Sequence, residues 1–441
     1  MSEVTDPEAG RASGDVRAGI LVTGNEVVNA TIRDENSPWL SEQLAGLGIA
    51  VDRVLIVPDD ADAIEEGLRH LAERNVDLII TSGGLGPTED DKTAASVARF
   101  AGREMVLDPG MEDKIAGILS RYAAARGVEL PKDGLDEANR KQAMVPAGAT
   151  PLDPVGTAPG LVVPGPEGVV VVVLPGPPRE LRPMWSEAIG TEAVSEVVER
   201  AGELELLRLR LFGLPESSLA AELRKIEESG GRFDDLEVTT CLRKGELEVD
   251  IRFRPPAADR AAALGSALVE AFPEELFSSD GTTIDQIVSD LLLDGPYTLS
   301  VAESCTAGLL AARLSSVPGA SRYFMGGAVT YSNQSKETMV GVSPKTLEEF
   351  GAVSPETAKE MAEGIRGSLG TDIGVSITGI AGPAGGSAEK PVGFVCFHVD
   401  GGRLGSLELA PTIPGGRNDI RERSALVALH LIRRLLQGVE K

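Results

Sequence analysis

The segment SVAESCTAG, residues 300–308, gathers several side chains that could act as nucleophiles. An apolar run ends at Glu303, then Ser304, Cys305 and Thr306 follow, and an apolar pattern with helical spacing begins soon after. Hydroxyls and thiols are weak nucleophiles until a neighbouring base or a lowered pKa activates them. The first question that this sequence raises is therefore which residue could supply the base.

The sequence has three histidines, and none is well placed for a Ser-His-Asp triad. His70 belongs to a different predicted domain. His430 lies in the apolar stripe of a predicted terminal helix, where a structural role is expected, and His398 ends a predicted strand. We therefore do not expect a histidine base. For Cys305 we expect a packing role.

A lysine base is the remaining option, and the segment VTYSNQSK offers a candidate. A predicted strand ends at Tyr331, and Lys336 falls in the first turn of the next predicted helix. The helix dipole disfavours a charged lysine there, and burial would lower its pKa further. We predict Ser304 as nucleophile and Lys336 as base, acting directly or through Tyr331. A solvated surface lysine is the alternative that these residues alone leave open.

A third loop, SITGIAGPAGG, follows another predicted strand and brings Thr378 and Gly379 to its end. Ligands in open α/β sheets bind at the carboxyl ends of strands, so the three loops should form one site. The helix expected to start near Thr306 would offer free N–H groups to an anion such as a phosphate. Arg417 and Arg421, from the terminal helix, could add positive charge, and Arg421 could help to lower the pKa of the lysine.

A second glycine-rich segment, TSGGLGPTEDDKT at residues 81–93, also follows a predicted strand. Gly83 and Gly84 permit a tight backbone wrap, and Asp90 and Asp91 precede a predicted helix. Glycines followed by acids suit a phosphorylated ligand whose charge is bridged by a divalent ion such as Mg²⁺, Mn²⁺ or Co²⁺. A glycine turn followed by an acidic helix cap is the alternative, and the chemistry alone does not decide between the two.

The elements that carry these segments fall into three predicted domains. Residues 18–190 alternate strands and helices, which predicts a parallel sheet covered on both faces. Residues 200–280 alternate apolar and polar positions, as half-buried antiparallel strands do, and predict a small α+β module. Residues 283–437 show the pattern of a second α/β domain. The polar residues 1–17 lack an apolar stretch, so we expect a disordered tail and not a signal peptide.

The composition is that of a globular protein and excludes several classes of function. The formal net charge of −26 opposes binding to a phosphate backbone, so no nucleic-acid partner is expected. Three cysteines, far apart in the sequence, argue against a disulfide framework. No apolar stretch approaches the length of a membrane span. We therefore expect a cytoplasmic protein with small-molecule partners and no membrane partner.

The segments AESCTAG, VPGAS, VTYSNQSK, GAVSPETAKEMAEG and TGIAGPAGGSAEKPVG closely resemble the C-terminal domain of the CinA (competence/damage-inducible protein A) family. The resemblance spans about residues 283–437. It implies a nicotinamide-nucleotide amidohydrolase, which converts nicotinamide mononucleotide to nicotinate mononucleotide and ammonia without a cofactor. It also implies Ser304 as nucleophile, with Tyr331 and Lys336 as the activating pair.

Further residues of this domain match the family pattern or depart from it. Ser321, Thr378 and an arginine of the terminal helix are similar to family substrate or active-site positions, and Ala307 stands where many members carry glycine. Combined with the strand-end analysis, the predicted substrate-binding residues are Thr306, Ser321, Thr378, Gly379, Arg417 and Arg421.

The segments LVTGNEVVNATIRDEN, SGGLGPTEDDKT, ANRKQAMVP, VGTAPGL and LPGPPRELRPMW resemble the molybdopterin-binding-like domain, a three-layer α/β/α fold, that opens CinA proteins. Residues 200–280 resemble the KH-like module of that family. The resemblance implies a second, divalent-metal-dependent hydrolysis of a nucleotide pyrophosphate such as ADP-ribose. Asn25 stands where the family usually has aspartate, which removes a charge near the expected metal ligands Asp90 and Asp91. The predicted nucleotide site comprises Glu26, Asn36, Gly83, Gly84 and Asp90.

A different class of function stays open beside this interpretation. The chain could be a non-enzymatic pterin- or nucleotide-binding protein linked to competence or DNA damage. A basic surface patch would favour that alternative, and the sequence shows no run of basic residues. The resemblance also leads us to expect a homodimer.

Overall fold

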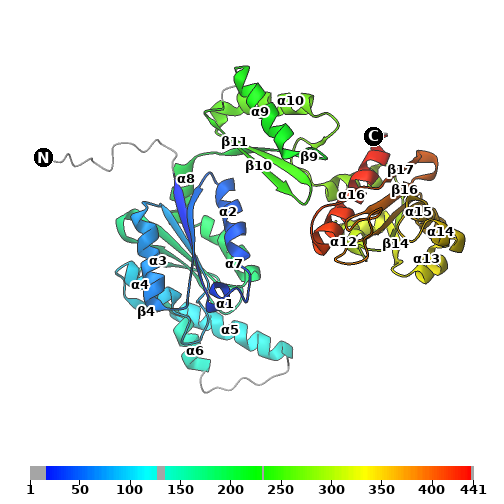
Figure 1. The fold of residues 1–441 in the computed structure, drawn as a ribbon. Coiled ribbons are helices and arrows are strands. Elements are labelled where there is room, and N and C mark those ends of the chain that lie inside the picture. The colour runs from blue at the N-terminus through cyan, green and yellow to red at the C-terminus, as the bar shows by residue number, and fades with distance from the viewer. Residues whose placement is uncertain (1–15, 127–134, 231–232, 439–441) are drawn as a thin grey trace. The chain divides into compact units, whose positions relative to one another are not determined.

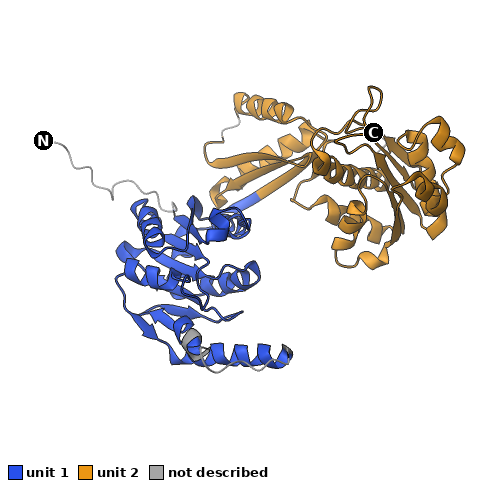
Figure 2. Ribbon diagram, turned by 60° about the horizontal axis from the view of Figure 1, so that its bottom comes forward, with its two compact units in different colours: residues 1–206 blue, residues 207–441 orange. Residues whose placement is uncertain are grey.

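The protein is described by a computed structural model that covers residues 16–126, 135–230 and 233–438. The chain divides into two compact units, residues 1–206 and residues 207–441 (Figure 2). The predicted tail, residues 1–17, lies outside the described residues except for its last two. Val16 is buried and Arg17 begins the first strand. No helix among the described residues is long and apolar enough to cross a membrane.

The first unit is built on a six-stranded sheet with the order β2-β1-β3-β8-β7-β6 (Figure 1). The strands are β1 (Arg17–Thr23), β2 (Ala50–Val57), β3 (Leu78–Ser82), β6 (Thr150–Leu152), β7 (Gly160–Pro164) and β8 (Val170–Leu174). Strands β2, β1, β3 and β8 are parallel, as predicted, whereas β6 and β7 pair antiparallel. The prediction of a parallel sheet is wrong for these two strands, because short connections without an α-helix join β6, β7 and β8.

Helices cover both faces of this sheet, which confirms the three-layer α/β/α fold. Leu40 of α2 and Trp185 of α7 belong to the apolar core on one face, with α8, and Leu68 of α3 and Val97 of α4 belong to the core on the other. A short antiparallel pair of strands, β4 (Met105–Leu107) and β5 (Met144–Pro146), forms a separate two-stranded sheet. The helices are α1 (Asn25–Val28), α2 (Asn36–Gly46), α3 (Ala61–Glu73), α4 (Thr93–Phe100), α5 (Pro109–Arg126), α6 (Leu135–Gln142), α7 (Pro178–Ile189) and α8 (Glu192–Ala201), with a 3₁₀ turn η1 (Pro166–Gly168).

The second unit begins with a four-stranded sheet of order β10-β11-β9-β12, on which two helices pack. Paired strands in it run antiparallel where the register is defined, which agrees with the alternating pattern of the sequence. The elements are β9 (Glu205–Phe212), α9 (Glu216–Glu228), β10 (Leu236–Arg243), β11 (Glu246–Phe253), η2 (Pro255–Ala257), α10 (Ala258–Ala271) and β12 (Leu276–Ser278).

The rest of the second unit is an α/β fold around a five-stranded sheet of order β14-β13-β15-β16-β17. The first three strands in this order are parallel, and the last two pair antiparallel. Helices α11, α12 and α16 cover one face, and α13, α14 and α15 cover the other. The elements are α11 (Ile284–Asp294), β13 (Leu299–Glu303), α12 (Leu309–Ser316), η3 (Ala320–Arg322), β14 (Phe324–Val329), α13 (Asn333–Val340), α14 (Pro344–Glu349), α15 (Pro355–Leu369), β15 (Ile373–Gly379), β16 (Val395–Asp400), η4 (Gly402–Leu404), β17 (Ser406–Leu409) and α16 (Arg417–Gln437).

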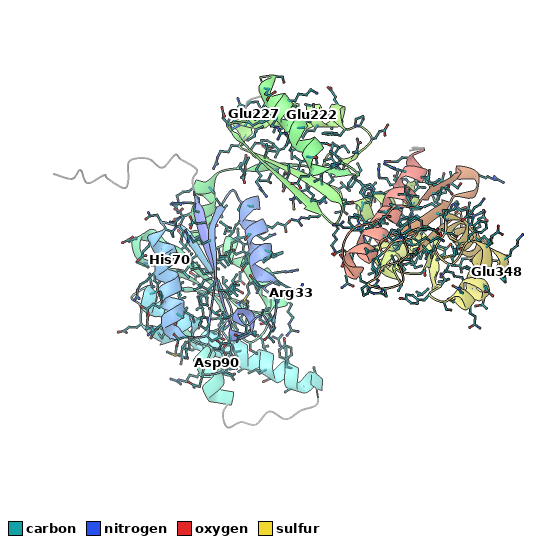
Figure 3. All side chains as sticks on the ribbon, viewed as in Figure 1. Arg33, His70, Asp90, Glu222, Glu227 and Glu348 are labelled. Atoms are coloured by element: carbon teal, nitrogen blue, oxygen red, sulfur yellow. The ribbon has the colours of Figure 1, made fainter. Side chains whose placement is uncertain are left out.

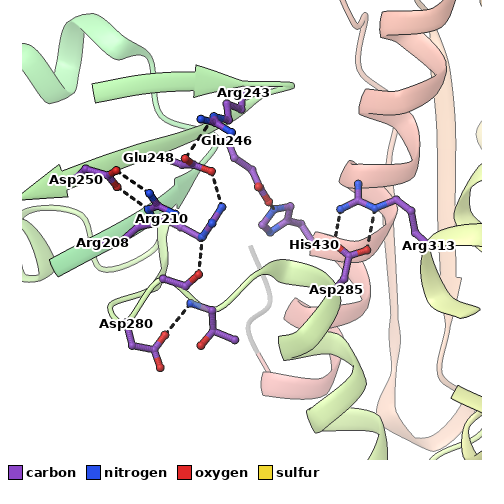
Figure 4. A network of polar contacts seen from close by, with 12 residues as sticks. Arg208, Arg210, Arg243, Glu246, Glu248, Asp250, Asp280, Asp285, Arg313 and His430 are labelled. Atoms are coloured by element: carbon purple, nitrogen blue, oxygen red, sulfur yellow. Dashed lines mark hydrogen bonds and ion pairs between the residues drawn. The ribbon is translucent and has the colours of Figure 1, made fainter. Parts of the chain in front are cut away.

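A buried contact joins the small module to helix α16 within the second unit (Figure 4). Nε2 of His430 lies 2.7 Å from Oε1 of Glu246, and the ring of Phe212 stacks on the histidine with 3.7 Å between centroids. Burial raises the pKa of Glu246 to about 7 and lowers the pKa of His430 well below its ordinary value. Both shifts favour uncharged side chains, as expected for titratable groups taken out of water.

Removing this histidine should destabilise the second unit. His430→Ala deletes a stacked ring and leaves a buried carboxyl group without its partner, so we expect a loss of about 3 kcal/mol or more in unfolding free energy. Glu246→Gln keeps a hydrogen-bonding group and should cost less than about 1 kcal/mol. Urea unfolding followed by far-UV circular dichroism measures both, with the exposed His70→Ala as control. Equal losses for His430→Ala and His70→Ala would contradict the structural role.

Candidate functional site

The ends of three parallel strands meet around Ser304, as the sequence predicted. The backbone N–H of Ser304, just after β13, donates to the carbonyl of Ile377 in β15 at 2.8 Å. On the other side, the N–H of Thr330, just after β14, donates to the carbonyl of Glu303 at 2.7 Å. The turn that holds Ser304 is thus fixed between two neighbouring strand ends.

Lys336 lies directly beside the predicted nucleophile. Its Nζ is 3.2 Å from Oγ of Ser304 and 2.8 Å from the carbonyl oxygen of Thr330. The side chain is 1% exposed, so it is not a solvated surface lysine. Burial lowers its pKa from the ordinary value. A lysine that is more easily deprotonated and bonded to a hydroxyl can take the proton of that hydroxyl.

Tyr331 is not part of this contact in the structure. Its side chain is 59% exposed, and its hydroxyl accepts a hydrogen bond of 3.0 Å from Nη2 of Arg417. Nη1 of the same arginine donates to the carbonyl of Gly382 in the glycine-rich loop, at 2.7 Å. Tyr331 and Arg417 therefore form an exposed pair beside that loop, and Lys336 reaches Ser304 without an intermediary.

The expected anion site at the start of the helix after Ser304 is wrong. The helix begins at Leu309 rather than near Thr306. The buried carboxylate of Glu303 accepts from the N–H groups of Gly308 at 3.0 Å, Leu310 at 3.1 Å and Ala311 at 2.8 Å. These donors would otherwise be available to a phosphate, so the side chain of the preceding strand has taken the place of a ligand.

The turn between Ser304 and this helix is held from a second side by Arg421. Nε of Arg421 donates to the carbonyl of Cys305, and its Nη2 donates to the carbonyl of Thr306, both at 3.0 Å. Ala307 has a φ of 51°, in the left-handed region that disfavours residues with a Cβ atom. The turn is therefore a strained backbone fixed by side chains around it.

The other predicted residues of this domain lie as follows. Thr306 is fully buried, and its hydroxyl has no hydrogen-bond partner among the described residues. Thr378 is buried and donates to the carbonyl of Ala352 at 2.7 Å. Gly379 ends β15, and Ser321 is exposed in η3.

Neither Cys305, the alternative nucleophile, nor any of the three histidines takes part in the contact between Ser304 and Lys336. Burial raises the pKa of the Cys305 thiol to about 11, which opposes thiolate formation. His398 lies inside β16 rather than at its end, with Nδ1 3.9 Å from a carboxylate oxygen of Glu408. His430 contacts the small module, and His70 lies on α3 of the first unit (Figure 3).

In the first unit, a cavity of about 630 Å³ lies beside the ends of β1, β3 and β8. Asn36, in the lining of this cavity, is 8% exposed. Its Nδ2 donates to the hydroxyl of Ser82 at 2.8 Å and to the carbonyl of Gly176 at 2.7 Å. Its Oδ1 has no hydrogen-bond partner among the described residues. A buried acceptor without a partner is available to a ligand. The structure brings all the residues predicted for this site to the lining of the cavity: Glu26, Asn36, Gly83, Gly84, Asp90 and Asp91.

Backbone packing requires the two predicted glycines. A Cβ at Gly83 would lie 2.4 Å from the carbonyl of Thr23, and one at Gly84 would lie 2.1 Å from the hydroxyl of Thr93. Both contacts are far closer than any real Cβ makes. These glycines therefore let the segment after β3 pass close to the end of β1 and the start of α4, whatever the ligand.

Sequence reasoning missed several lining residues, of which Asp59 is the most informative. Burial raises the pKa of this carboxyl group, and the charges of Glu26, Asp90 and Asp91 add to the shift. Asp59 follows β2 in the segment LIVPDDA, and its position after a strand end could have drawn attention to it. The lining residues that the sequence analysis did not name also include Arg33 (Figure 3), Asp34, Glu35, Thr157 and Glu180.

The residues that line this cavity include the ligand types that a divalent cation prefers, but they do not form a complete coordination site. Carboxylate and amide oxygens line the wall, and these are the donors that Mg²⁺ prefers. Asp91, however, accepts from the N–H and hydroxyl of Thr88 at 2.9 and 2.5 Å. Among the described residues no three His, Cys, Asp or Glu side chains converge as a metal site. An ion would therefore keep water ligands and share the phosphates of a substrate.

Comparison with known proteins matches both parts of the chain. The family model of the CinA C-terminal domain matches residues 281–436, and that of a probable molybdopterin binding domain matches residues 19–195. A CinA-like protein of Mycolicibacterium paratuberculosis is 50% identical over 430 residues, which cover 95% of this chain and 98% of that protein. A CinA-like protein of Mycobacterium tuberculosis is 48% identical over 427 residues, which cover 96% and 98%.

Solved structures match part of the chain. The competence/damage inducible protein CihA of Agrobacterium tumefaciens is 38% identical, with a TM-score of 0.34, and the match covers 34% of this chain and 94% of that one. The relatives that match nearly the whole chain, together with the two domain matches, show that the chain belongs to the CinA family.

Proposed function

We propose that the chain is an amidohydrolase that converts nicotinamide mononucleotide to nicotinate mononucleotide and ammonia. The observation that supports this most is the 3.2 Å contact between Nζ of Lys336 and Oγ of Ser304 in a buried setting. A hydroxyl paired with a lysine of lowered pKa is a known arrangement for nucleophilic attack on a carbonyl group. Membership of the CinA family agrees with this proposal.

The proposed reaction has two stages, formation of an ester on Ser304 and its hydrolysis. Oγ of Ser304 attacks the carboxamide carbon while its proton passes to Nζ of Lys336. The C–N bond then breaks, and the nitrogen takes that proton from Lys336 and leaves as ammonia. A water molecule then attacks the resulting ester and gives a proton to Nζ of Lys336, the bond to Oγ breaks, and Lys336 returns that proton to Oγ, so that nicotinate mononucleotide and the free serine are released.

Of the two arginines of α16 that the sequence analysis named, Arg417 is the better candidate for the substrate phosphate. Arg421 already donates to two carbonyl groups of the turn that holds Ser304. Arg417 is exposed, at the N-terminus of α16, and one of its partners is Tyr331, which is also exposed. Because Glu303 occupies the start of α12, the phosphate needs a cation elsewhere. We therefore assign substrate contact to Arg417 and Tyr331.

A second activity, hydrolysis of a nucleotide pyrophosphate such as ADP-ribose, is supported by the cavity of the first unit. Its volume of about 630 Å³ suits a nucleotide-sized ligand. The acidic lining would repel a bare diphosphate, so divalent cations would have to bind with it, held by Asp90 and neighbouring carboxylates. When bound, such ions would neutralise the phosphates and activate water.

Loss of the serine hydroxyl should abolish deamidation. Ser304→Ala should lower kcat for ammonia release from nicotinamide mononucleotide by roughly three powers of ten or more, because nucleophile removal normally has effects of this size. Cys305→Ala is the matched control and should keep most of the activity. If Ser304→Ala retained more than roughly a tenth of wild-type activity, direct attack by water would replace the covalent mechanism.

The base makes a separate prediction about pH. Because burial lowers the pKa of Lys336 below 10.5, the neutral lysine should build up as pH rises, and kcat/KM should climb towards a plateau below that value. Lys336→Met and Lys336→Arg should both abolish turnover, since arginine stays protonated. The exposed Lys345→Met on α14 should leave the profile unchanged. Near-normal activity of Lys336→Arg would make the lysine an electrostatic anchor instead of the base.

The first unit can be tested by restoring the missing carboxylate. The N–H of Asn25 donates to Asp59 at 2.9 Å, so Asn25→Asp places a second charge at the start of α1, beside the cavity. Metal-dependent hydrolysis of ADP-ribose should rise by about fivefold or more, equivalent to about 1 kcal/mol, with deamidation unchanged. Assays with Mg²⁺, Mn²⁺ and Co²⁺ measure this, and Asn29→Asp next to the same helix is the control. If the rate of ADP-ribose hydrolysis does not rise with any of these metals, Asn25 is not the residue that limits this activity.

A further inference from the structure

Glu303 makes more contacts around the candidate nucleophile than any role of simple packing requires. Its side chain is 1% exposed, and its two carboxylate oxygens accept three backbone N–H groups at the start of α12. A buried carboxylate is stable only when such donors satisfy it. The same residue ends β13, so the side chain spans the whole turn that contains Ser304.

The backbone of Glu303 connects the same turn to the base. Its carbonyl oxygen accepts from the N–H of Thr330 at 2.7 Å, and the carbonyl of Thr330 accepts from Nζ of Lys336 at 2.8 Å. Glu303 therefore fixes three things at once: the end of β13, the start of α12 and the strand end to which the lysine is bonded. The hydroxyl and amine of the Ser304–Lys336 pair are held between these points.

The turn itself has reason to move if this bonding is lost. Ala307 and Gly308 both have positive φ, 51° and 96°, and the first of them carries a Cβ atom that disfavours this conformation. The N–H of Gly308, the second of these residues, is bonded to Oε2 of Glu303. Arg421 holds the carbonyls of Cys305 and Thr306 on the other side. A carboxylate on one side and a guanidinium on the other thus hold a strained four-residue turn.

We propose that Glu303 is a positioning residue whose carboxylate, seated at the start of α12, holds Ser304 within reach of Lys336 and keeps substrate anions out of this helix terminus. The inference deepens the proposed function, because it concerns the same serine and lysine. It assigns the negative charge at α12 to the protein rather than to the substrate. The phosphate of the nucleotide is then bound by other groups, and changes at Glu303 act on the rate of the chemical step rather than on substrate affinity.

A small fluorophosphonate tests this geometry without the nucleotide substrate. Oγ of Ser304 attacks phosphorus, its proton passes to Lys336, the P–F bond breaks and fluoride leaves, so that the labelling rate reports how well the pair is aligned. Mass spectrometry locates the label at Ser304, and Lys336→Met sets the baseline. The exposed Glu356→Gln, in the first turn of α15, is the matched control for loss of a carboxylate near a helix start.

Glu303→Gln should slow labelling by about tenfold or more, because displacements of about an ångström cost a catalytic group this much. An amide offers one acceptor oxygen where the carboxylate offers two, and its NH₂ group would face an N–H donor.

Glu303→Ala should be labelled more slowly still. Added formate should restore part of its labelling rate by occupying the place of the missing carboxylate. Formate should not help Glu303→Gln, where the side chain leaves no room. Amide hydrogen exchange at residues 308–311 should rise in both variants and fall again with formate in the alanine variant.

With nicotinamide mononucleotide, Glu303→Gln should lower kcat by a similar factor and leave KM within about twofold. Labelling of Glu303→Gln at the wild-type rate, or a loss confined to KM, would overturn the positioning role. Wild-type labelling without ammonia release would reject the proposed amidase and leave the role of Glu303 standing. A wild-type Ser304 that labels no faster than in Lys336→Met would overturn the inference, since there would be no aligned pair to position.

Discussion

The burial of one lysine amine is the constraint on which the candidate active site depends. Removing an ammonium group from water is costly unless an opposite charge compensates for it. Among the described residues, Nζ of Lys336 has two hydrogen-bond partners, the hydroxyl of Ser304 and the carbonyl of Thr330, and both are neutral. The environment therefore favours the uncharged amine, which is the form that can accept a proton. An acidic partner at the same place would have made a stable ion pair and a poor base.

The two charged side chains around the turn contact backbone groups and not the amine of Lys336. The carboxylate of Glu303 is bonded to backbone N–H groups of α12, and the guanidinium of Arg421 is bonded to backbone carbonyls. Each charge is satisfied by peptide dipoles, and no salt bridge joins either of them to Lys336 among the described residues. Two charged side chains hold the turn, while the candidate pair of Ser304 and Lys336 between them forms hydrogen bonds to neutral groups.

The sequence was sufficient for the parts of the site that follow from strand ends. Because parallel strands in one sheet end at the same edge, the segments after β13, β14 and β15 had to meet, and the pairing of Ser304 with Lys336 followed from this. The first unit behaved in the same way, since the glycines and acids predicted from their places in the chain line one cavity. The antiparallel pairing of β7 and β16 was not predicted, because the hydrophobic runs of such strands resemble those of parallel ones.

What the sequence could not give is the direction of individual side chains. Glu303 was visible only as the last residue of a strand, and nothing in its neighbours indicates that it turns back onto the following helix. Arg417 and Arg421 are one helical turn apart, yet one meets a tyrosine at the surface and the other meets the backbone of a buried turn. Such choices depend on which donors remain unpaired after the chain has folded, and this is a property of the assembled sheet and helices.

The same limit applies to Asn36. Its Nδ2 bonds Ser82 and Gly176, and only the structure shows that its Oδ1 has no partner among the described residues. Functional assignment in this chain therefore depends less on finding the reactive residue types than on finding which polar atoms the fold has already paired.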